Sequence, residues 1–542
     1  MEGEGGRPRA VFMAFGTKGD VYPIAAIASA LSCDRKDYDV ILITHSAHKS
    51  LAGSLEARGV HFIPVSTPAV LSRNHGSSAE DSGELPFSMQ KKAIRVGHRK
   101  ECLSAVEGIF GDGPSLEGDF ILINFFALEG WNLAELFQVC CVVAAPYVVP
   151  YSAPSSFERQ FKDELPLLHR HLQESPLGKV CWSDVIHWMW PLFTEDWGSW
   201  RSDSLNLSPI PFTDPVTCLP SWSSLEQSPL LLYGFSKEVV ECPGYWPPNV
   251  HACGFWFLPM DWQFSCAQCR ERMLHRSAYL TMTEELCSSH VDLEHFMKTS
   301  GHSCRPIFVG LSSIGSMGYI VNPRAFLLVL KAVTERTGQR FILFSSGYET
   351  LDAAIRLMAD ELPNPVQTPQ SDCAGDFALL HENRLFCFSG NVPYSWLFPK
   401  CAAVIHHGAG EKLGLRSFTE RPLPLRKNGS TAAAVAAGVP QGTPFRWCAL
   451  LCWISFYWAE RMHWLGLAPE PLQKGSLVPE DDDAATIERG ACAVMRAIES
   501  ALSPDVRSHA AEMAERVSME DGIAAALKIL EQQVLRPRGG DG

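Results

Sequence analysis

Mainly apolar runs, none broken by more than one polar residue or glycine, recur along the first half of the chain. They are Ala10–Phe15 (AVFMAF), Val40–Thr44, Phe120–Phe125, Cys141–Ala145 and Leu230–Phe235. Apolar runs without alternation are typical of strands in a parallel sheet that is covered on both faces. Segments with helical spacing separate several of them, and Pro23 opens one that extends to Leu31. This alternation predicts an α/β layered domain.

The same pattern restarts in the second half of the chain. Its predicted strands are Pro306–Ser313 (PIFVGLSS), Phe341–Gly347, Leu385–Gly390 and Ala402–His407. We predict an N-terminal domain over 1–258, a polar linker over 259–304, a second domain over 305–484, and helices over 485–542 that pack back toward the N-terminal domain. Residues 363–376 are predicted to form a surface loop. Two doubly wound domains place ligands at the carboxyl ends of their strands, in a cleft that both domains face.

Composition narrows the class of protein. The chain has 542 residues and a formal net charge of −14, which disfavours nucleic acid as a partner because phosphate binding needs a basic face. Met1–Ala10 lacks the apolar centre of a secretory signal, so we expect the 18 cysteines to be reduced. The longest apolar run, Trp447–Trp458, is shorter than the roughly 20 residues of a membrane span. We expect a cytoplasmic protein, with peripheral membrane contact left open.

An anion site is suggested near the end of the last predicted strand. His406-His407-Gly408 and Gly410 follow an apolar run, and Ser430 and Thr431 precede an alanine-rich helix that stops at Gly438-Val439-Pro440-Gln441. Glycine-rich turns let backbone N–H groups approach a phosphate, and a helix start favours negative charge. In this chain a charged, proline-bearing stretch, Glu411–Asn428, separates the two parts.

These residues resemble the donor-binding half of UDP-dependent glycosyltransferases of the GT-B fold, and most of all the plant sterol 3-β-glucosyltransferases. The first half agrees, because FGTKGDVYPIAAIASAL is similar to the opening "GTRGDVQP" segment of that group. Further similar stretches are ALEGWNLAELF, AAPYVVPYSAPSSFERQF, PIFVGLSSIGSMG, NVPYSWLFP and FYWAERMHWLG. The resemblance covers most of the chain and implies two Rossmann-like domains.

The resemblance also implies roles for individual residues. Asp20 matches the acidic position of the opening motif and is assigned as general base, with a turn or N-cap carboxylate as the alternative; Gly16 and Gly19 shape its turn. His406 is assigned to the donor diphosphate, whereas His407 is a weaker candidate because adjacent strand residues point to opposite faces. On the donor side we add Ser313, Gly315, Ser316 and Val392, with ordinary loop residues as the alternative. Neither a metal nor a cofactor is expected beyond UDP-glucose as donor substrate.

Two segments depart from the family pattern. Family members pass from the His-Gly turn to Gly-Ser-Thr almost without a gap, and they carry an Asp-Gln pair where this chain has Gly442–Ser455 (GTPFRWCALLCWIS). We interpret both segments as retained intron or altered splicing in the translated sequence, with a lineage-specific loop as the alternative. Either origin separates Ser430 and Thr431 from His406. We therefore expect an intact fold with an impaired donor site.

Two further patterns have competing explanations. An aromatic stretch that includes Trp188 and Trp190 either lines an apolar acceptor pocket or packs in the core. Cys266-x2-Cys269 and Cys287-x2-His290 have a spacing near that of structural zinc ligands, but we favour reduced surface thiols.

The sequence thus predicts an inverting glycosyltransferase that moves glucose from UDP-glucose to a sterol or similar lipid. The alternatives are a catalytically inactive lipid-binding or regulatory protein on the same scaffold, and a glycosyltransferase for a small phenolic or terpenoid acceptor.

Overall fold

The structure is a computed structural model. It describes residues 6–16, 18–68, 87–111, 115–146, 155–176, 178–208, 213–214, 216–217, 228–242, 244, 246–259, 262, 266, 268–269, 290–298, 305–311, 320–345, 348–361, 377–390, 392–406, 430–442 and 453–537. These residues form two compact units. The first contains the described residues up to Phe257 and from Asp521 onward, and the second those from Leu258 to Glu520.

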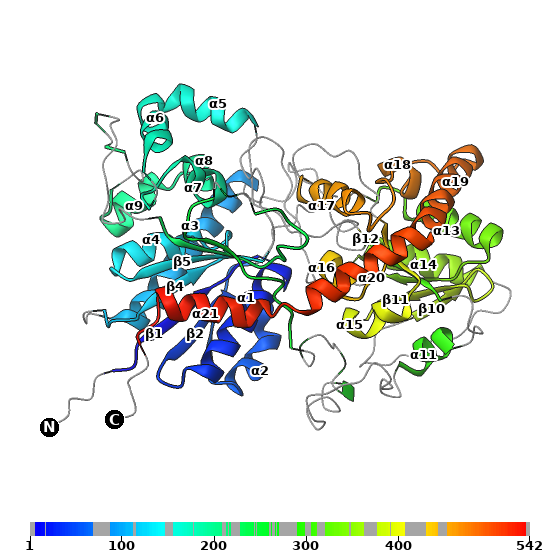
Figure 1. The fold of residues 1–542 in the computed structure, drawn as a ribbon, viewed down its shortest axis with the longest axis horizontal. Coiled ribbons are helices and arrows are strands. Elements are labelled where there is room, and N and C mark those ends of the chain that lie inside the picture. The colour runs from blue at the N-terminus through cyan, green and yellow to red at the C-terminus, as the bar shows by residue number, and fades with distance from the viewer. Residues whose placement is uncertain are drawn as a thin grey trace, which may run out of the picture. The chain divides into compact units, whose positions relative to one another are not determined.

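The first unit is built on a seven-stranded parallel sheet of order β3-β2-β1-β4-β5-β6-β7 (Figure 1). Its strands are β1 (Arg9–Met13), β2 (Asp39–His45), β3 (Val60–Val65), β4 (Phe120–Ile123), β5 (Cys140–Ala145), β6 (Leu230–Tyr233) and β7 (Val250–Ala252). The order reverses between β1 and β4, so this is the topological switch point at which doubly wound sheets bind ligands.

The helices of the first unit pack on this sheet or on one another. They are α1 (Lys18–Asp34), η1 (Ser46–Leu51), α2 (Ala52–Glu56), α3 (Phe87–Phe110), α4 (Leu128–Leu136), α5 (Ser155–Glu164), α6 (Pro166–Glu174), α7 (Trp182–Asp184), the π-helical η2 (Val185–Met189), α8 (Trp190–Thr194), α9 (Gly198–Leu205) and α21 (Gly522–Gln533). The central strands are buried along most of their length: all four residues of β4 are fully buried, and in β1 only the first residue, Arg9, is partly exposed. The continuous apolar runs of the sequence therefore reflect coverage on both faces.

Helix α1 differs from the prediction at its start. Pro23 was expected to open the helix, but α1 begins at Lys18 and Pro23 is its sixth residue. Proline lacks the N–H that would otherwise bond back to the carbonyl of Gly19. The first turn of α1 therefore includes Gly19 and Asp20, so that Asp20 lies at a helix N-terminus rather than in a preceding loop.

The second unit is built on a six-stranded sheet of order β10-β11-β9-β8-β12-β13. Its strands are β8 (Ile307–Gly310), β9 (Phe341–Phe344), β10 (Phe377–Leu380), β11 (Leu385–Phe388), β12 (Ala403–His406) and β13 (Gln441–Gly442). Among these strands only β10, at one edge, is antiparallel. The order of this sheet reverses between β8 and β12. Both units are therefore doubly wound α/β domains, as predicted.

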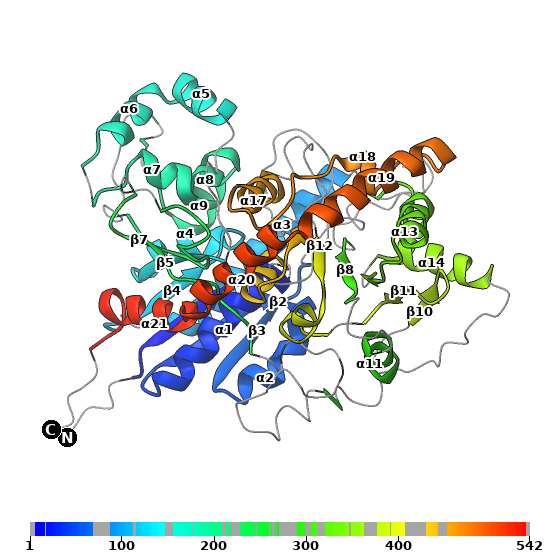
Figure 2. The same ribbon diagram turned by 45° about the vertical axis from the view of Figure 1, so that its right-hand side comes forward.

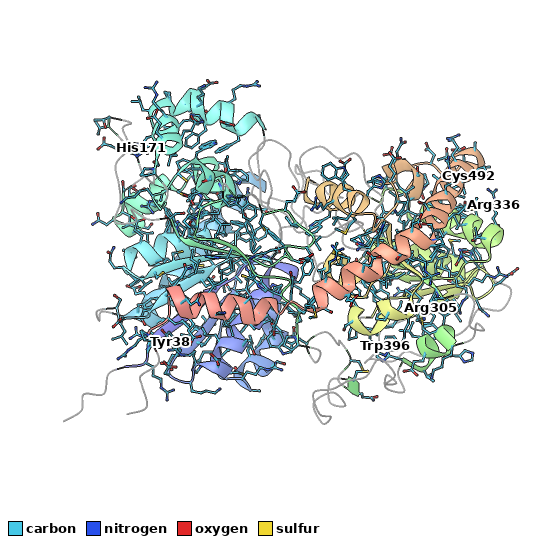
Figure 3. All side chains as sticks on the ribbon, viewed as in Figure 1. Tyr38, His171, Arg305, Arg336, Trp396 and Cys492 are labelled. Carbon is cyan, nitrogen blue, oxygen red and sulfur yellow. The ribbon has the colours of Figure 1, made fainter. Side chains whose placement is uncertain are left out.

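The helices of the second unit are α11 (Val291–Lys298), α13 (Pro323–Thr337), α14 (Glu349–Asp360), α15 (Tyr394–Leu397), η5 (Phe398–Lys400), α16 (Ser430–Ala436), α17 (Trp453–Trp464), α18 (Lys474–Leu477), α19 (Ala484–Ala501) and α20 (Pro504–Ser518). Helix α19 packs on α13 (Figure 2). There Arg336 forms a two-pronged ion pair with Glu488, and its Nη1 lies 3.7 Å from Cys492 Sγ (Figure 3).

The C-terminal helices divide between the two units. Within the helices predicted over 485–542, α20 ends at Ser518 and α21 begins at Gly522, and α21 packs against α1 in the first unit (Figure 1). Trp256 Nε1 donates to the carbonyl of Gly522 at 3.1 Å. The backbone N–H of Arg536 donates to the hydroxyl of Tyr38 at 2.7 Å (Figure 3). Of the predicted C-terminal helical segment, α21 thus lies in the N-terminal unit, while α19 and α20 lie in the second.

Candidate active site

Three strands of the first unit end beside one another at the switch point of the sheet. Because β2, β1 and β4 are adjacent and parallel, the residues that follow them share one edge. These residues are Gly16 after β1, His45 at the end of β2 and Asn124 after β4. Polar side chains directly after fully apolar strands are costly to bury unless they are paired. The carboxyl edge therefore carries the polar chemistry of this unit.

Gly16 lies in the tight turn between β1 and α1, and Asp20 lies in the first turn of α1. Gly16 has a φ of +102°, and a side-chain Cβ at this position would stand 2.6 Å from Asp20 Oδ2. The Asp20 side chain is 1% exposed and lies in the first turn of α1, where the helix dipole favours a carboxylate. Only glycine both adopts this φ readily and leaves room for the carboxylate. Gly19, in the same first turn, was the other glycine expected to shape this segment.

Asn124 and His48 hold that turn from two sides. The Asn124 side chain accepts from the N–H of Phe15 at 3.2 Å and donates to the carbonyl of Phe15 at 2.8 Å. The same amide group lies 3.3 Å from the carbonyl of Asp20. His48 Nε2 contacts the carbonyl of Gly16 at 3.0 Å. The backbone that presents Asp20 is thus fixed by side chains from two other parts of the chain.

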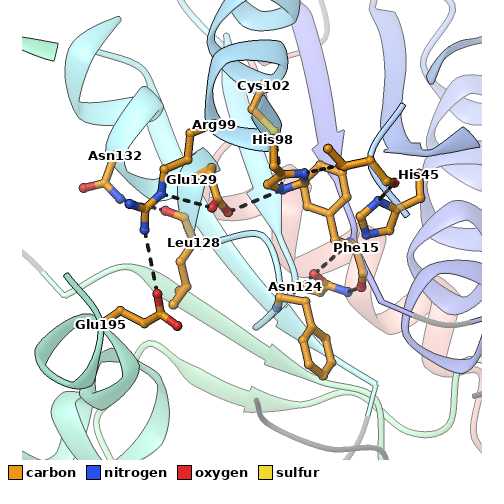
Figure 4. Close-up of polar contacts among 12 residues, drawn as sticks. Phe15, His45, His98, Arg99, Cys102, Asn124, Leu128, Glu129, Asn132 and Glu195 are labelled. Carbon is orange, nitrogen blue, oxygen red and sulfur yellow. Dashed lines mark hydrogen bonds and ion pairs between the residues drawn. The ribbon is translucent and has the colours of Figure 1, made fainter. Parts of the chain in front are cut away.

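A histidine pair extends this polar edge (Figure 4). The rings of His45 and His98 lie 5.6 Å apart between centroids, and Phe15 packs against both. Thr67 connects them: its carbonyl bonds His45 Nδ1 at 2.9 Å and its hydroxyl bonds His98 Nδ1 at 2.8 Å. Burial, together with nearby His98 and His48, lowers the pKa of His45 to about 3. His45 is therefore neutral across the physiological range.

An acidic and basic cluster from α3 and α4 adjoins the histidine pair (Figure 4). Glu129 lies 3.9 Å from His98 Nε2 and 3.6 Å from Arg99 Nε. Arg99 also lies 3.9 Å from Glu195 and stacks 4.1 Å from the ring centre of Trp197. Burial lowers the pKa of the Arg99 guanidinium, and the two glutamates oppose that effect. The charges of this cluster are therefore paired with one another.

Sequence reasoning identified Asp20 but missed its companions. His45, His98 and Asn124 belong to no motif quoted above, Glu129 lies in the ALEGWNLAELF stretch but was given no role, and Asn124 is 109 residues from the Phe15 backbone that it holds. One signal was present: Asn124 directly follows the apolar strand β4 and His45 ends the largely apolar strand β2, at the edge where ligands bind.

In the second unit, His406 lies at the corresponding switch point. It is the last residue of β12, pairs in register with Gly310 at the end of β8, and is fully buried. Its Nε2 lies 2.9 Å from the side-chain oxygen of Gln441, and the Gln441 amide nitrogen faces Met462 Sδ at 3.6 Å. An amide oxygen only accepts, so Nε2 carries the hydrogen of this bond. The role of His406 toward a diphosphate stays a prediction.

The structure describes only part of the remaining donor side. Ser430 and Thr431 open α16, which leads into β13 and so completes a strand–helix–strand unit with β12. Val392 is buried just before α15. Gly442 belongs to β13, and α17 begins at Trp453, within the atypical Gly442–Ser455 stretch. Outside the described residues are Ser313, Gly315, Ser316, His407, Gly408, Gly410, the Glu411–Asn428 stretch and the 363–376 loop.

The two candidate acceptor-side tryptophans are buried. Trp188 and Trp190 are 1% and 0% exposed; Trp188 lies 5.6 Å from Trp131 and Trp190 lies 5.6 Å from Phe157, both between ring centroids. Within the described part of the chain, neither indole N–H has a hydrogen-bond partner. These contacts are those of an aromatic core, and a role in acceptor binding stays a prediction.

No protein-family profile matches the chain. Curated proteins do match it along nearly its whole length. The sterol 3-beta-glucosyltransferase UGT80B1 of Arabidopsis thaliana is 24% identical over 96% of this chain and 67% of its own length. The sterol 3-beta-glucosyltransferase UGT80A2 of the same plant is 24% identical over 96% of this chain and 64% of its own length. The chain thus spans about two thirds of the length of these relatives.

The fold has solved counterparts as well. The calicheamicin glycosyltransferase CalG4 superimposes with a TM-score of 0.52 at 14% identity, covering 97% of this chain and 98% of that one. With its two doubly wound domains, this protein has the GT-B fold of glycosyltransferases. Its homologues include sterol 3-β-glucosyltransferases. Among the described helices, none combines the length and apolar character needed to cross a bilayer.

Proposed function

We propose that this chain is an inverting glycosyltransferase that transfers glucose from UDP-glucose to the hydroxyl of a sterol or similar lipid. The observation that carries the proposal is the match to sterol 3-β-glucosyltransferases over 96% of the chain. The geometry supports it independently, because Asp20 and His406 each lie at the switch point of a doubly wound sheet.

In this proposal Asp20 is the general base. As the acceptor oxygen attacks the anomeric carbon of glucose, the bond from that carbon to the diphosphate oxygen breaks, and UDP leaves. The acceptor proton passes to the Asp20 carboxylate. Gly16 leaves room for that carboxylate, and Asn124 holds the backbone of the turn that carries it.

The donor diphosphate is assigned to the start of α16. The helix start at Ser430 and Thr431 supplies donors there, and His406 lies at the same switch point from β12. The hydrogen bond between His406 Nε2 and Gln441 occupies one ring nitrogen and orients the ring. Residues 407–429 stand between His406 and α16. Because the helix start is not tied closely to the strand end along the chain, we expect weak donor binding.

Transfer of labelled glucose tests the proposal. The purified chain is incubated with labelled UDP-glucose and a panel of sterols in detergent micelles, and solvent-extractable label is measured. Transfer to a sterol that is lost in Asp20→Asn supports the assignment. Sterol binding without transfer, also in a variant that lacks residues 411–428, would indicate an inactive lipid-binding scaffold. Transfer to phenolic or terpenoid acceptors alone would contradict the sterol assignment.

A further inference from the structure

Three metal-ligating side chains converge in the second unit, away from the residues assigned to catalysis. The Sγ atoms of Cys266 and Cys269 and a ring nitrogen of His290 all lie within 4.8 Å of one another. Cys269 Sγ is 3.5 Å from His290 Nδ1. Zinc at about 2.3 Å from sulfur and about 2.0 Å from nitrogen holds tetrahedral ligands about 3.5–3.8 Å apart. The three atoms are therefore close to the spacing that one ion requires.

The burial of these residues contradicts the expectation of surface thiols. Cys266, Cys269 and His290 are 0%, 1% and 2% exposed. The two cysteines lie among the apolar residues that cover one face of the β-sheet, and the His290 ring packs 6.1 Å from Phe388. A buried imidazole is costly unless its nitrogens are engaged. Apolar packing alone gives no reason for a His290 ring nitrogen to lie beside two sulfur atoms from a different part of the chain.

The ligand set fits the chemistry of zinc. Cys266-x2-Cys269 is a chelating pair on one stretch of chain, and His290 comes from 21 residues further on, immediately before α11. Thiolate and imidazole are the ligands of structural zinc sites, which bind four of them. Cys287 repeats the spacing before His290 in the sequence, but it lies outside the described residues and the proposal does not include it.

We propose that Cys266, Cys269 and His290 bind a structural zinc ion. The ion would join the stretch of chain that carries Cys266 and Cys269 to the start of α11. Helix α11 lies next to the sheet (Figure 2), and the rings of Phe296 and Phe386 are 5.3 Å apart between centroids. Apolar contacts of the same cluster hold both stretches against that sheet. A zinc link would fix this segment of the second unit without taking part in glycosyl transfer.

Metal analysis of the full-length chain tests this directly. Chain purified without chelators should contain about one zinc ion per molecule by plasma mass spectrometry. Replacement with Co²⁺ should give the visible and near-ultraviolet bands of a tetrahedral thiolate complex, whose intensity reports the number of thiolates. Removing the ion with a strong chelator should lower the melting temperature. These readouts use the native chain and do not depend on a variant that folds.

Variants locate the ion. Cys269→Ala and His290→Gln should each lose zinc and the cobalt bands. Cys401→Ala is the matched control, because Cys401 is a buried cysteine of the same apolar cluster; it should keep both. Wild-type chain that folds without zinc and gives no cobalt bands would overturn the proposal. So would a disulfide between Cys266 and Cys269 in the freshly purified protein, or equal zinc content in all variants.

Discussion

At the residue scale, the position of the Asp20 carboxylate is set by its neighbours in the fold. Gly16 leaves space for it, Asn124 holds the backbone on either side of the turn, and α1 begins early enough to place it in the first helical turn. The sequence left an alternative open, in which Asp20 serves only as a turn or N-cap carboxylate. In that case its replacement should not lower the rate of glucosyl transfer.

Asp20→Asn should lower kcat for glucosyl transfer by about 100- to 10,000-fold, because the amide cannot accept the acceptor proton. Initial rates are compared in the wild-type chain and in the variant without residues 411–428. The melting temperature should change little, since the amide is of similar size. Asp34→Asn, at the far end of α1, is the control and should keep full activity. An Asp20→Asn enzyme within tenfold of wild type would contradict the assignment of the base.

His45 should make folding sensitive to acid. Its pKa is about 3 in the folded state and near 6.5 when exposed, so the unfolded chain binds an extra proton between these values. The free energy of unfolding therefore falls as pH drops below about 6.5, by up to about 1.4 kcal/mol per pH unit from this group.

Urea unfolding at several pH values between about 7 and about 5 measures this slope. His45→Asn keeps a donor for the Thr67 carbonyl and removes the titration, so its stability should fall less steeply with acid. His61→Asn, an exposed histidine on the neighbouring strand β3, should leave the slope unchanged. Equal slopes in wild type and His45→Asn would refute the explanation.

At the element scale, the last helix is held to the first unit by a close backbone approach. A Cβ on Gly522 would come within 2.5 Å of the carbonyl oxygens of Phe255 and Gly254. Both are backbone atoms, so neither can move aside cheaply. The same turn receives the Trp256 N–H and sets the direction of α21.

Gly522→Ala should therefore destabilise the first unit by about 1–3 kcal/mol, as overpacking does in well-packed regions. Gly97→Ala is the matched control: Gly97 lies within α3, and a Cβ added there would meet no described atom within 4 Å. This change should be neutral or stabilising by up to about 1 kcal/mol. Thermal and urea unfolding of the two variants are compared. Equal stability of Gly522→Ala and wild type would show that the backbone relaxes.

Prediction of elements from sequence succeeded where strands are central and failed at edges. The central strands β1, β4, β8 and β9 were found within a few residues, because burial on both faces makes them uniformly apolar. Strand β3 was missed: it is an edge strand, its burial varies along its length, and it contains Pro64. A proline is tolerated at an edge, where an N–H can remain outside the ladder.

At the scale of the whole molecule, the chain keeps the GT-B architecture, while residues 411–428 separate in sequence the two parts of the predicted donor site. Both sheets are complete in the described residues, and α16 and β13 follow β12 in the expected order. Removing residues 411–428 joins Gly410 to Gly429, which gives the short connection that the family resemblance predicts. The deletion should strengthen UDP-glucose binding by about tenfold or more and raise turnover by up to about 100-fold.

Isothermal titration with UDP and with UDP-glucose measures the effect. Deletion of residues 364–375, within the other predicted surface loop of this half, is the control and should leave donor affinity unchanged. If the full chain binds UDP-glucose as tightly as the 411–428 deletion, the stretch is a tolerated loop and the donor site is not impaired.

The sequence alone determined the central strands, their alternation with helices, and the glycine turn before Asp20, because these depend on burial pattern and on local backbone preference. Tertiary structure decided which distant residues meet: Asn124 and His98 beside that turn, Gln441 against His406, and His290 against Cys266 and Cys269. Such pairs are fixed by the packing of separate elements, so local patterns do not establish them; the Cys and His spacing indicated which residues could meet, and only the fold brought them together.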